Sequence, residues 1–331
     1  MGHAALIMKY LRVNKSDYNF RHRLLMRHSW IKTFGGWLSL SRPSFHTVGI
    51  LPFILGTVLA YKIAGSFSTA IFALGVCAII LIMLSTYHAG EYFDYREDEI
   101  SHRYYRSKFA GGSGVIPGGK LPRAVPFWTS VISFVLAGIL GIILQFYFQT
   151  GRFTMLLGCL GAFLGFFYST KPIRLVERGI GEIFIVFCYG WLPVASAYYI
   201  QTATIHPIIH LISISIGLTI FNVILLNEFP DYYADKCVGK KNLLYRAGKK
   251  AGLMIYTACA FSASAAMLLS PLGGVPFKII YFYLPVFIIS MFIVAMIFRQ
   301  KHEERKMLEI LCGLNIVVNL GTSLSFILAY L

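Results

Sequence analysis

The chain has 331 residues, of which 57% are hydrophobic and only 13% are charged, and its formal net charge is +16. This composition is too apolar and too poor in charge for one or two ordinary soluble domains, so we expect an integral membrane protein. The positive charge would suggest a nucleic-acid partner in a soluble protein, but its placement along the chain, described below, argues against one.

Apolar stretches close to the roughly 20 residues needed to cross a bilayer follow one another along the whole chain. Turn or charged residues separate each stretch from the next. The expected spans are residues 46–64, 67–89, 125–148, 153–169, 181–200, 207–226, 251–270, 276–298 and 308–330. The predicted fold class is therefore all-α, a polytopic bundle of about nine transmembrane helices. Pro52 weakens the first span and the fourth is short, so eight and ten remain open.

The basic residues lie almost entirely on one side of this topology. Of the 30 lysines and arginines, all but Lys62, Arg152 and Lys278 fall on the side of the N-terminus, together with all 14 acidic residues. The positive-inside rule then predicts a cell-membrane protein with a cytoplasmic N-terminus and an external C-terminus. We expect residues 1–34 to form a basic cytoplasmic segment, lying along anionic membrane lipids or disordered, and residues 35–331 to form the membrane domain.

Two ladders of polar residues stand at the ends of spans two and six. The first ladder is Asp94 and Asp98, and the second is Asn227, Asp231 and Asp235. Residues four apart lie on one face of a helix, so each ladder presents oxygen atoms in one direction, as a Mg²⁺ site requires. A solvated helix end is the plainer alternative. The recurrence after two even-numbered spans favours a metal site on the cytoplasmic side.

A basic, glycine-containing loop follows each ladder, which is the complement expected around a diphosphate. The glycine-rich run 111–119 lacks the ending of a P-loop and is more typical of a flexible lid, with a plain linker as the alternative.

Tyr168, at the end of span four, is a candidate for stabilising a carbocation through its ring, or an interfacial tyrosine. His88 is better explained as a core histidine than as a base or ligand. The candidate diphosphate-binding residues are Arg103, Arg106, Lys108, Lys120, Lys171, Lys240 and Lys241.

Taken together, these patterns resemble the UbiA superfamily of intramembrane prenyltransferases over nearly the whole chain. The opening LSRPSFHTVGILPFILGTVLA is similar to its first helix, and the ladders are similar to its two Asp-rich motifs. The segment from Tyr168 to Glu182 looks most like the branch that prenylates 1,4-dihydroxy-2-naphthoate in menaquinone synthesis. The resemblance implies a helical bundle around a central cavity that uses Mg²⁺ to transfer a polyprenyl group from its diphosphate to an aromatic acceptor.

Carried over by position, the resemblance also implies a set of site residues. The catalytic residues would be Asp94, Asp98, Asp231 and Asp235, to which the aromatic pattern above adds Tyr168. The metal ligands would be the four aspartates with Asn227, and Glu91 is added as a candidate ligand because of the departure described next. The chain departs from the family at Gly90, which stands where the first motif usually begins with Asn. Glycine has no side-chain oxygen, so Glu91 or water would have to supply the missing ligand.

Several alternatives to this function stay open at the level of sequence. The acceptor could instead be 4-hydroxybenzoate, homogentisate, haem or a glycerol phosphate, and neither the isoprenoid length nor the oligomeric state is indicated. Intramembrane acids also build ion pathways, which makes a cation-coupled transporter the rival from another class. A transporter is expected to expose acids to both sides of the membrane, whereas the external side here has none.

Overall fold

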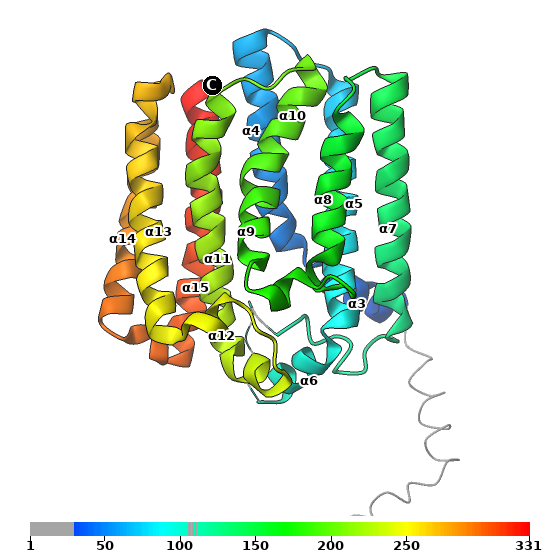
Figure 1. The fold of residues 1–331 in the computed structure, drawn as a ribbon, viewed down its shortest axis with the longest axis vertical. Helices are drawn as coiled ribbons and strands as arrows, with labels where there is room; N and C mark the ends of the chain where they lie inside the picture. Colours follow the sequence, from blue (N-terminus) through cyan, green and yellow to red (C-terminus); the bar gives the residue numbers. More distant parts are fainter. Residues whose placement is uncertain (1–29, 105–106, 108, 110) are drawn as a thin grey trace, which may run out of the picture.

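The computed structural model describes residues 30–331 except 105, 106, 108 and 110. Most of the predicted N-terminal segment therefore lies outside the described residues, as do Arg106 and Lys108. Within the described part of the chain, apolar helices run side by side along one axis (Figure 1), and eight of them are long and apolar enough to cross a membrane. A ninth, the 16-residue helix α8, completes the predicted set of about nine spans.

The helices follow the expected spans closely. The spanning elements are α4 (Pro43–Ala64), α5 (Thr69–Phe93), α7 (Ala124–Ile142) with η1 (Ile143–Tyr147), α8 (Thr154–Ser169), α9 (Gly181–Val186) with η3 (Phe187–Trp191) and α10 (Leu192–Thr202), α11 (Ile208–Val238), α13 (Lys249–Leu269) with η4 (Ser270–Gly273), α14 (Ile279–Phe298) and α15 (Arg305–Tyr330). The remaining elements are α3 (Trp30–Ser41), α6 (Tyr95–Tyr104), η2 (Leu175–Arg178), α12 (Leu243–Ala247) and η5 (Lys301–Glu303).

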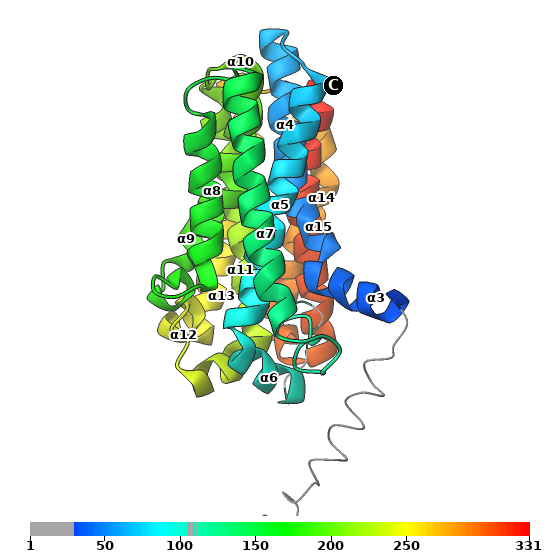
Figure 2. The same ribbon diagram turned by 90° about the vertical axis from the view of Figure 1, so that its right-hand side faces the viewer.

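One end of the bundle carries the short elements. Helices α6 and α12 lie there, and α3 projects sideways from the same end (Figure 2). We call this the site end, because both ladders lie at it. The C-terminus lies at the opposite end (Figure 1). The chain therefore crosses an odd number of times between α3 and Leu331, as the predicted topology requires.

The two ladders differ in how the backbone presents them. Helix α5 ends at Phe93, and Asp94 stands at a break with φ −89° and ψ 16° before α6 begins. The N–H of Asp98 still donates to the carbonyl oxygen of Asp94 at 2.9 Å, so the helical spacing of the first ladder survives the bend. Helix α11 instead runs unbroken for 31 residues, about 46 Å, and carries the second ladder on its last turns.

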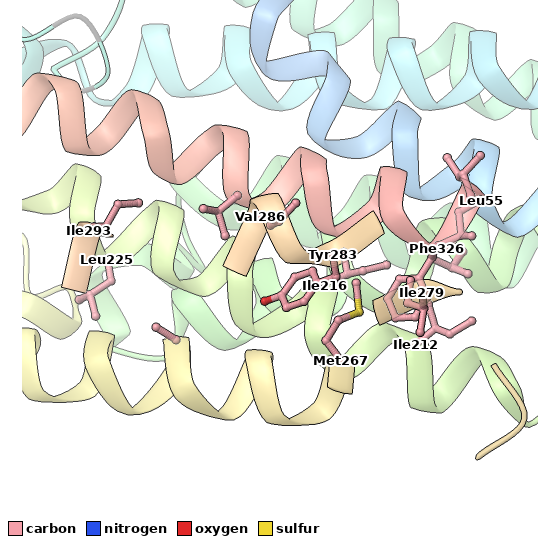
Figure 3. Close-up of a cluster of buried hydrophobic side chains, with 14 of the residues drawn as sticks. Leu55, Ile212, Ile216, Leu225, Met267, Ile279, Tyr283, Val286, Ile293 and Phe326 are labelled. Carbon is pink, nitrogen blue, oxygen red and sulfur yellow. The ribbon is translucent and has the colours of Figure 1, made fainter. Parts of the chain in front are cut away.

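The bundle has a tightly packed half and an open half. The main apolar core joins α4, α11, α13, α14 and α15 through side chains such as Leu55, Ile216 and Phe326, which are fully buried (Figure 3). A Cβ at Gly56 would lie 2.2 Å from the carbonyl oxygen of Val194, so only glycine permits this approach of α4 to α10. The helices α5, α7, α8 and α10 enclose space instead, and that space leads to the candidate site.

Candidate active site

The two ladders face one another across a cavity of about 240 Å³ at the site end. Asp94 and Asp98 line it from the α5–α6 junction, and Asn227, Asp231 and Asp235 line it from α11. Residues far apart in the sequence are thus brought together, as the ladder pattern predicts. Tyr168 and Gly90 also line this cavity, so Tyr168 lies beside both ladders.

A single lysine connects the ladders. The Nζ of Lys240 lies 3.9 Å from Oδ2 of Asp94 and 3.9 Å from Oδ1 of Asp235. Burial lowers the pKa of Lys240, but the charges of Asp94 and Asp235 outweigh it, so the pKa is held well above its usual value. Lys240 is therefore a permanently charged ammonium inside the cavity. Such a group is suited to bind an oxygen of a phosphate ester.

Two arginines that the sequence analysis did not assign to the site complete its charge. Arg174 donates to Oδ1 of Asp94 at 2.9 Å and also pairs with Glu97. Arg42 donates to Oε1 of Glu91 at 3.0 Å. Both arginines have left-handed backbone conformations, with φ 44° at Arg174 and φ 47° at Arg42, which are uncommon outside glycine and tend to occur at functional positions. The available signal was their position beside spans one and four, at the same end of the bundle as the ladders.

Asp98 is the most crowded carboxyl of the first ladder. Its side chain is buried, and the pKa of Asp98 is raised well above its usual value, first by burial and then by the nearby charges of Glu91 and Asp94. The glycine-rich loop packs directly on it, because a Cβ at Gly112 would lie 2.3 Å from its Oδ2. A dense group of carboxylates of this kind is energetically unfavourable unless cations offset it.

The glycine-rich loop is anchored to Asp231 of the second ladder and to Glu91, which precedes the first ladder. The N–H of Gly111 donates to Oδ2 of Asp231 at 2.7 Å, and the hydroxyl of Ser101 donates to Oδ1 at 2.9 Å. The N–H and hydroxyl of Ser113 donate to Oε1 and Oε2 of Glu91 at 2.6 and 2.9 Å. Both oxygens of Glu91 are therefore engaged by protein donors. Its role as a metal ligand stays a prediction, and the geometry gives it a second role as the anchor of this loop.

The other candidate bases lie away from the cavity. Arg103 pairs with Glu99 at 3.7 Å on an exposed face of α6. The side chains of Lys120, Lys171 and Lys241 are exposed and do not line the cavity. His88 is fully buried, and its Nε2 lies 3.1 Å from the hydroxyl of Ser41, as expected for a core histidine.

The site residues suit a hard divalent cation in the presence of a phosphate ligand. The side-chain Oδ1 of Asn227 is buried without a hydrogen-bond partner, and four aspartates share its cavity. Among the described residues, no three His, Cys, Asp or Glu side chains form a ready cage for a metal. Mg²⁺ is commonly bound through one or two carboxylates, waters and substrate phosphates, so a preformed protein cage is not required.

A second cavity, of about 320 Å³, continues from the first into the bundle. It lies between α5, α7, α8 and α10 and is lined by apolar side chains and many glycines. The two cavities share four lining residues: Thr86, Gly165, Cys188 and Tyr189. Together they form a polar chamber that opens into an apolar one.

Comparison with known proteins agrees with this arrangement. The sequence model of the UbiA prenyltransferase family matches residues 50–314. The chain belongs to this family. It is therefore a prenyltransferase and an integral membrane protein, which confirms the resemblance predicted from the ladders.

Among curated proteins, the chain is 26% identical over 224 residues to a 2-carboxy-1,4-naphthoquinone phytyltransferase of Synechocystis, covering 67% of this chain and 69% of that protein. It is 26% identical over 219 residues to a 1,4-dihydroxy-2-naphthoate octaprenyltransferase of Bacillus subtilis, covering 66% and 68%. A UbiA homologue from Aeropyrum pernix has the same fold, with a TM-score of 0.64, 15% identity and coverage of 86% and 98%. A homologue from Archaeoglobus fulgidus, bound to DMAPP and Mg²⁺, gives a TM-score of 0.61 at 15% identity, with coverage of 86% and 98%.

Proposed function

We propose that this chain transfers a polyprenyl group from polyprenyl diphosphate to 1,4-dihydroxy-2-naphthoate, with Mg²⁺ as cofactor. The observation that carries this proposal is the junction of the polar and apolar cavities, which matches a substrate with a charged head and an apolar tail. The naphthoate acceptor is supported by the names of the relatives from Synechocystis and Bacillus subtilis. The structures of the Archaeoglobus fulgidus homologue with DMAPP or GPP and Mg²⁺ support the donor and the metal.

The charged groups of the polar cavity would hold the diphosphate. Asp94, Asp98, Asn227, Asp231 and Asp235 would hold Mg²⁺, which neutralises the charge that develops on the departing diphosphate. Lys240 contributes a fixed ammonium between the ladders and would bind a diphosphate oxygen directly. Arg174 holds Asp94 in place, so the oxygens of the first ladder need no rearrangement when charge develops.

The apolar cavity would protect the prenyl group from water during the transfer. Its walls exclude water from the allylic carbon as the carbon–oxygen bond to diphosphate breaks. The ring of Tyr168 lies at the polar cavity beside the ladders, where it would stabilise the developing positive charge by cation–π attraction. The electron pair for the new carbon–carbon bond comes from the acceptor ring, which regains its aromaticity by losing the group on the attacked carbon: a proton from a C–H carbon, or CO₂ from the carbon that bears the carboxylate.

One experiment tests the acceptor and the reaction class together. The purified chain would be incubated with labelled polyprenyl diphosphates and a panel of acceptors, with Mg²⁺ or with EDTA. We expect Mg²⁺-dependent prenylation of 1,4-dihydroxy-2-naphthoate. Selective prenylation of 4-hydroxybenzoate, homogentisate or a glycerol phosphate would show that the proposed acceptor is wrong. Full turnover in EDTA would contradict the metal-dependent mechanism. The family assignment favours an enzyme over the cation-coupled transporter.

We also propose that the site end faces the cytoplasm. Lys62 lies in the last turn of α4, Arg152 precedes α8 and Lys278 precedes α14, so these three bases lie at the end of the bundle opposite the ladders. The remaining described bases, including those of both ladder loops, lie toward the site end. This distribution is the one that the positive-inside rule associates with a cytoplasmic face.

A further inference from the structure

A third cavity lies apart from the candidate active site. It is a groove of about 1220 Å³ formed by α13, the end of α14, the start of α15 and the last turns of α11. Helices α13 and α14 stand on the side of the bundle opposite α7 (Figure 1). The wall of the groove along α13 is apolar and includes Leu253, Met254, Ala258 and Phe261. The residues that we assign to prenyl transfer do not line it.

The site end of this groove is polar and basic. Lys249, Lys250 and Arg305 line it, against Glu303 and Glu309, so the charged side chains in the described part of the lining sum to +1. The ammonium of Lys249 lies 4.5 Å from the ring centre of Tyr233 and 5.0 Å from that of Tyr232, which fixes it at the rim. The groove thus has a basic end at the membrane surface and an apolar wall directed into the bilayer.

The backbone adds to this positive potential. Helix α13 begins with Lys249 and Lys250, and α15 begins with Arg305. Neither helix has a side-chain cap at its N-terminus or an acidic residue in its first turn. Positive side chains at the positive end of a helix dipole are unfavourable, and a bound anion offsets both charges. Two helix starts meet at one groove, that of α13 without an acidic residue in its first turn or at its N-cap and that of α15 with Glu304 as its N-cap residue.

We propose that the groove binds one anionic phospholipid, with its phosphodiester at Lys249, Lys250 and Arg305 and an acyl chain along α13. The net charge of +1 matches the single negative charge of a phosphodiester lipid such as phosphatidylglycerol. The order of the lining, basic at the surface and apolar below it, matches a lipid better than it matches a soluble phosphate.

The groove also adjoins the helix that carries the second ladder. Phe229, Pro230 and Tyr233 of α11 line the groove, while Asp231 and Asp235 of the same turns line the active-site cavity. A lipid in the groove therefore packs against the end of α11 that must hold two of the proposed metal ligands. The lipid site does not depend on the proposed prenyl transfer, because its test measures binding.

The test uses the purified full chain and counts bound lipid by native mass spectrometry, with phosphatidylglycerol and phosphatidylcholine as competing probes. We expect a preference for phosphatidylglycerol that falls by about tenfold or more when Lys249→Gln and Lys250→Gln are combined, since each base near a membrane surface contributes about 1 kcal/mol toward an anionic lipid. Ala258→Trp, which fills the groove without changing charge, should remove the same bound lipid.

Two matched variants separate this site from general surface effects. Lys306 is exposed and is the second residue of α15, as Lys250 is of α13, but it does not line the groove. Ala265 is exposed on α13, two turns beyond Ala258, and also lies outside the groove. Lys306→Gln and Ala265→Trp should keep the preference for phosphatidylglycerol.

If Lys306→Gln and Lys250→Gln lowered the preference for phosphatidylglycerol equally, the preference would depend only on the overall charge of the surface, and the proposal would be overturned. An equal loss in Ala265→Trp and Ala258→Trp would do the same. Displacement of phosphatidylglycerol by inorganic phosphate at constant ionic strength would assign the groove to a soluble anion instead.

Discussion

The ammonium of Lys240, just beyond the end of α11, lies 3.9 Å from a carboxylate oxygen of Asp94, the first-ladder residue at the break between α5 and α6. Because the same ammonium is equally close to Asp235, the two ladders share one fixed positive charge. We predict that Lys240→Gln lowers donor turnover at least about tenfold, since a charge that faces the leaving diphosphate is lost. Lys241→Gln removes the same charge from an exposed neighbouring position and should have a much smaller effect. Equal losses in the two variants would show that only bulk charge matters.

The carboxylates themselves provide a stronger test of the site. We predict that Asp94→Asn or Asp231→Asn lowers diphosphate release from a polyprenyl diphosphate by at least about 100-fold, because each removes a charged ligand where charge develops. Glu99→Gln is the matched control, since Glu99 lies next to Asp98 in sequence but is about half exposed and pairs with Arg103. Release at the wild-type rate in both aspartate variants would remove the basis for a metal-diphosphate site.

The position where this chain leaves the family pattern permits a direct comparison of two roles for Glu91. A Mg²⁺ titration of donor turnover separates them. If Glu91 binds metal, Glu91→Gln should raise the half-saturating Mg²⁺ concentration, and Ser113→Ala should not. If Glu91 anchors the loop, both variants should lower turnover with little change in Mg²⁺ dependence.

Gly90 is expected to accept a side chain. A Cβ at this position would lie 3.8 Å from the hydroxyl oxygen of Ser169, an ordinary contact, and the position lines the cavity. We predict that Gly90→Asn folds normally. If the site lacks a metal ligand at residue 90, Gly90→Asn should also lower the half-saturating Mg²⁺ concentration again in a Glu91→Gln background. Loss of the folded protein in Gly90→Asn, judged by thermal unfolding and elution volume, would contradict the open space seen here.

The apolar cavity predicts a change in donor preference. Gly158 lines it, and a Cβ there would have no neighbour within 4 Å, so a larger side chain would extend into open space. Gly158→Phe should lower kcat/KM for long polyprenyl diphosphates by about tenfold or more while leaving dimethylallyl diphosphate nearly unaffected, since one or two lost apolar contacts cost several-fold each. A uniform loss across donor lengths would mean that the tail is bound elsewhere.

The orientation in the membrane is tested by chemical labelling. In a cysteine-free background, we predict that cysteines replacing the exposed Lys120 and Lys241 resist a membrane-impermeant thiol reagent in intact cells and react once the cells are opened. A cysteine replacing the exposed Lys278 should react in intact cells. The reverse pattern at all three positions would invert the topology.

The sequence predicts the set of membrane-spanning helices well, because such helices are recognised by length and hydrophobicity alone. The meeting of the ladders was also predictable, since both end spans on the same side. Which of the candidate lysines and arginines enters the cavity was not predictable from the sequence. The backbone of Gly239 is left-handed, and the N–H of Lys240 donates back to the carbonyl oxygen of Asp235 at 2.9 Å. This helix end brings Lys240 over the ladder, while Lys241 remains exposed.

The two arginines illustrate the same limit. Their contacts depend on left-handed backbone at Arg42 and Arg174, and non-glycine residues give no sequence sign of that conformation. Glu91 was predictable as an acidic residue near the proposed metal site. Its two bonds to Ser113 arise from the folding of a glycine-rich loop whose path no periodicity specifies.

The order of the two cavities along the bundle has a consequence for the product. In the proposed reaction, a tail bound in the apolar cavity would lie at membrane depth, while the new bond would form near the ladders at the end of the bundle. Once diphosphate had left, the prenylated ring would lie near the end of the bundle and its chain among the apolar helices. The product would then have the orientation of a bilayer lipid before its release, so its chain would not have to cross a polar layer.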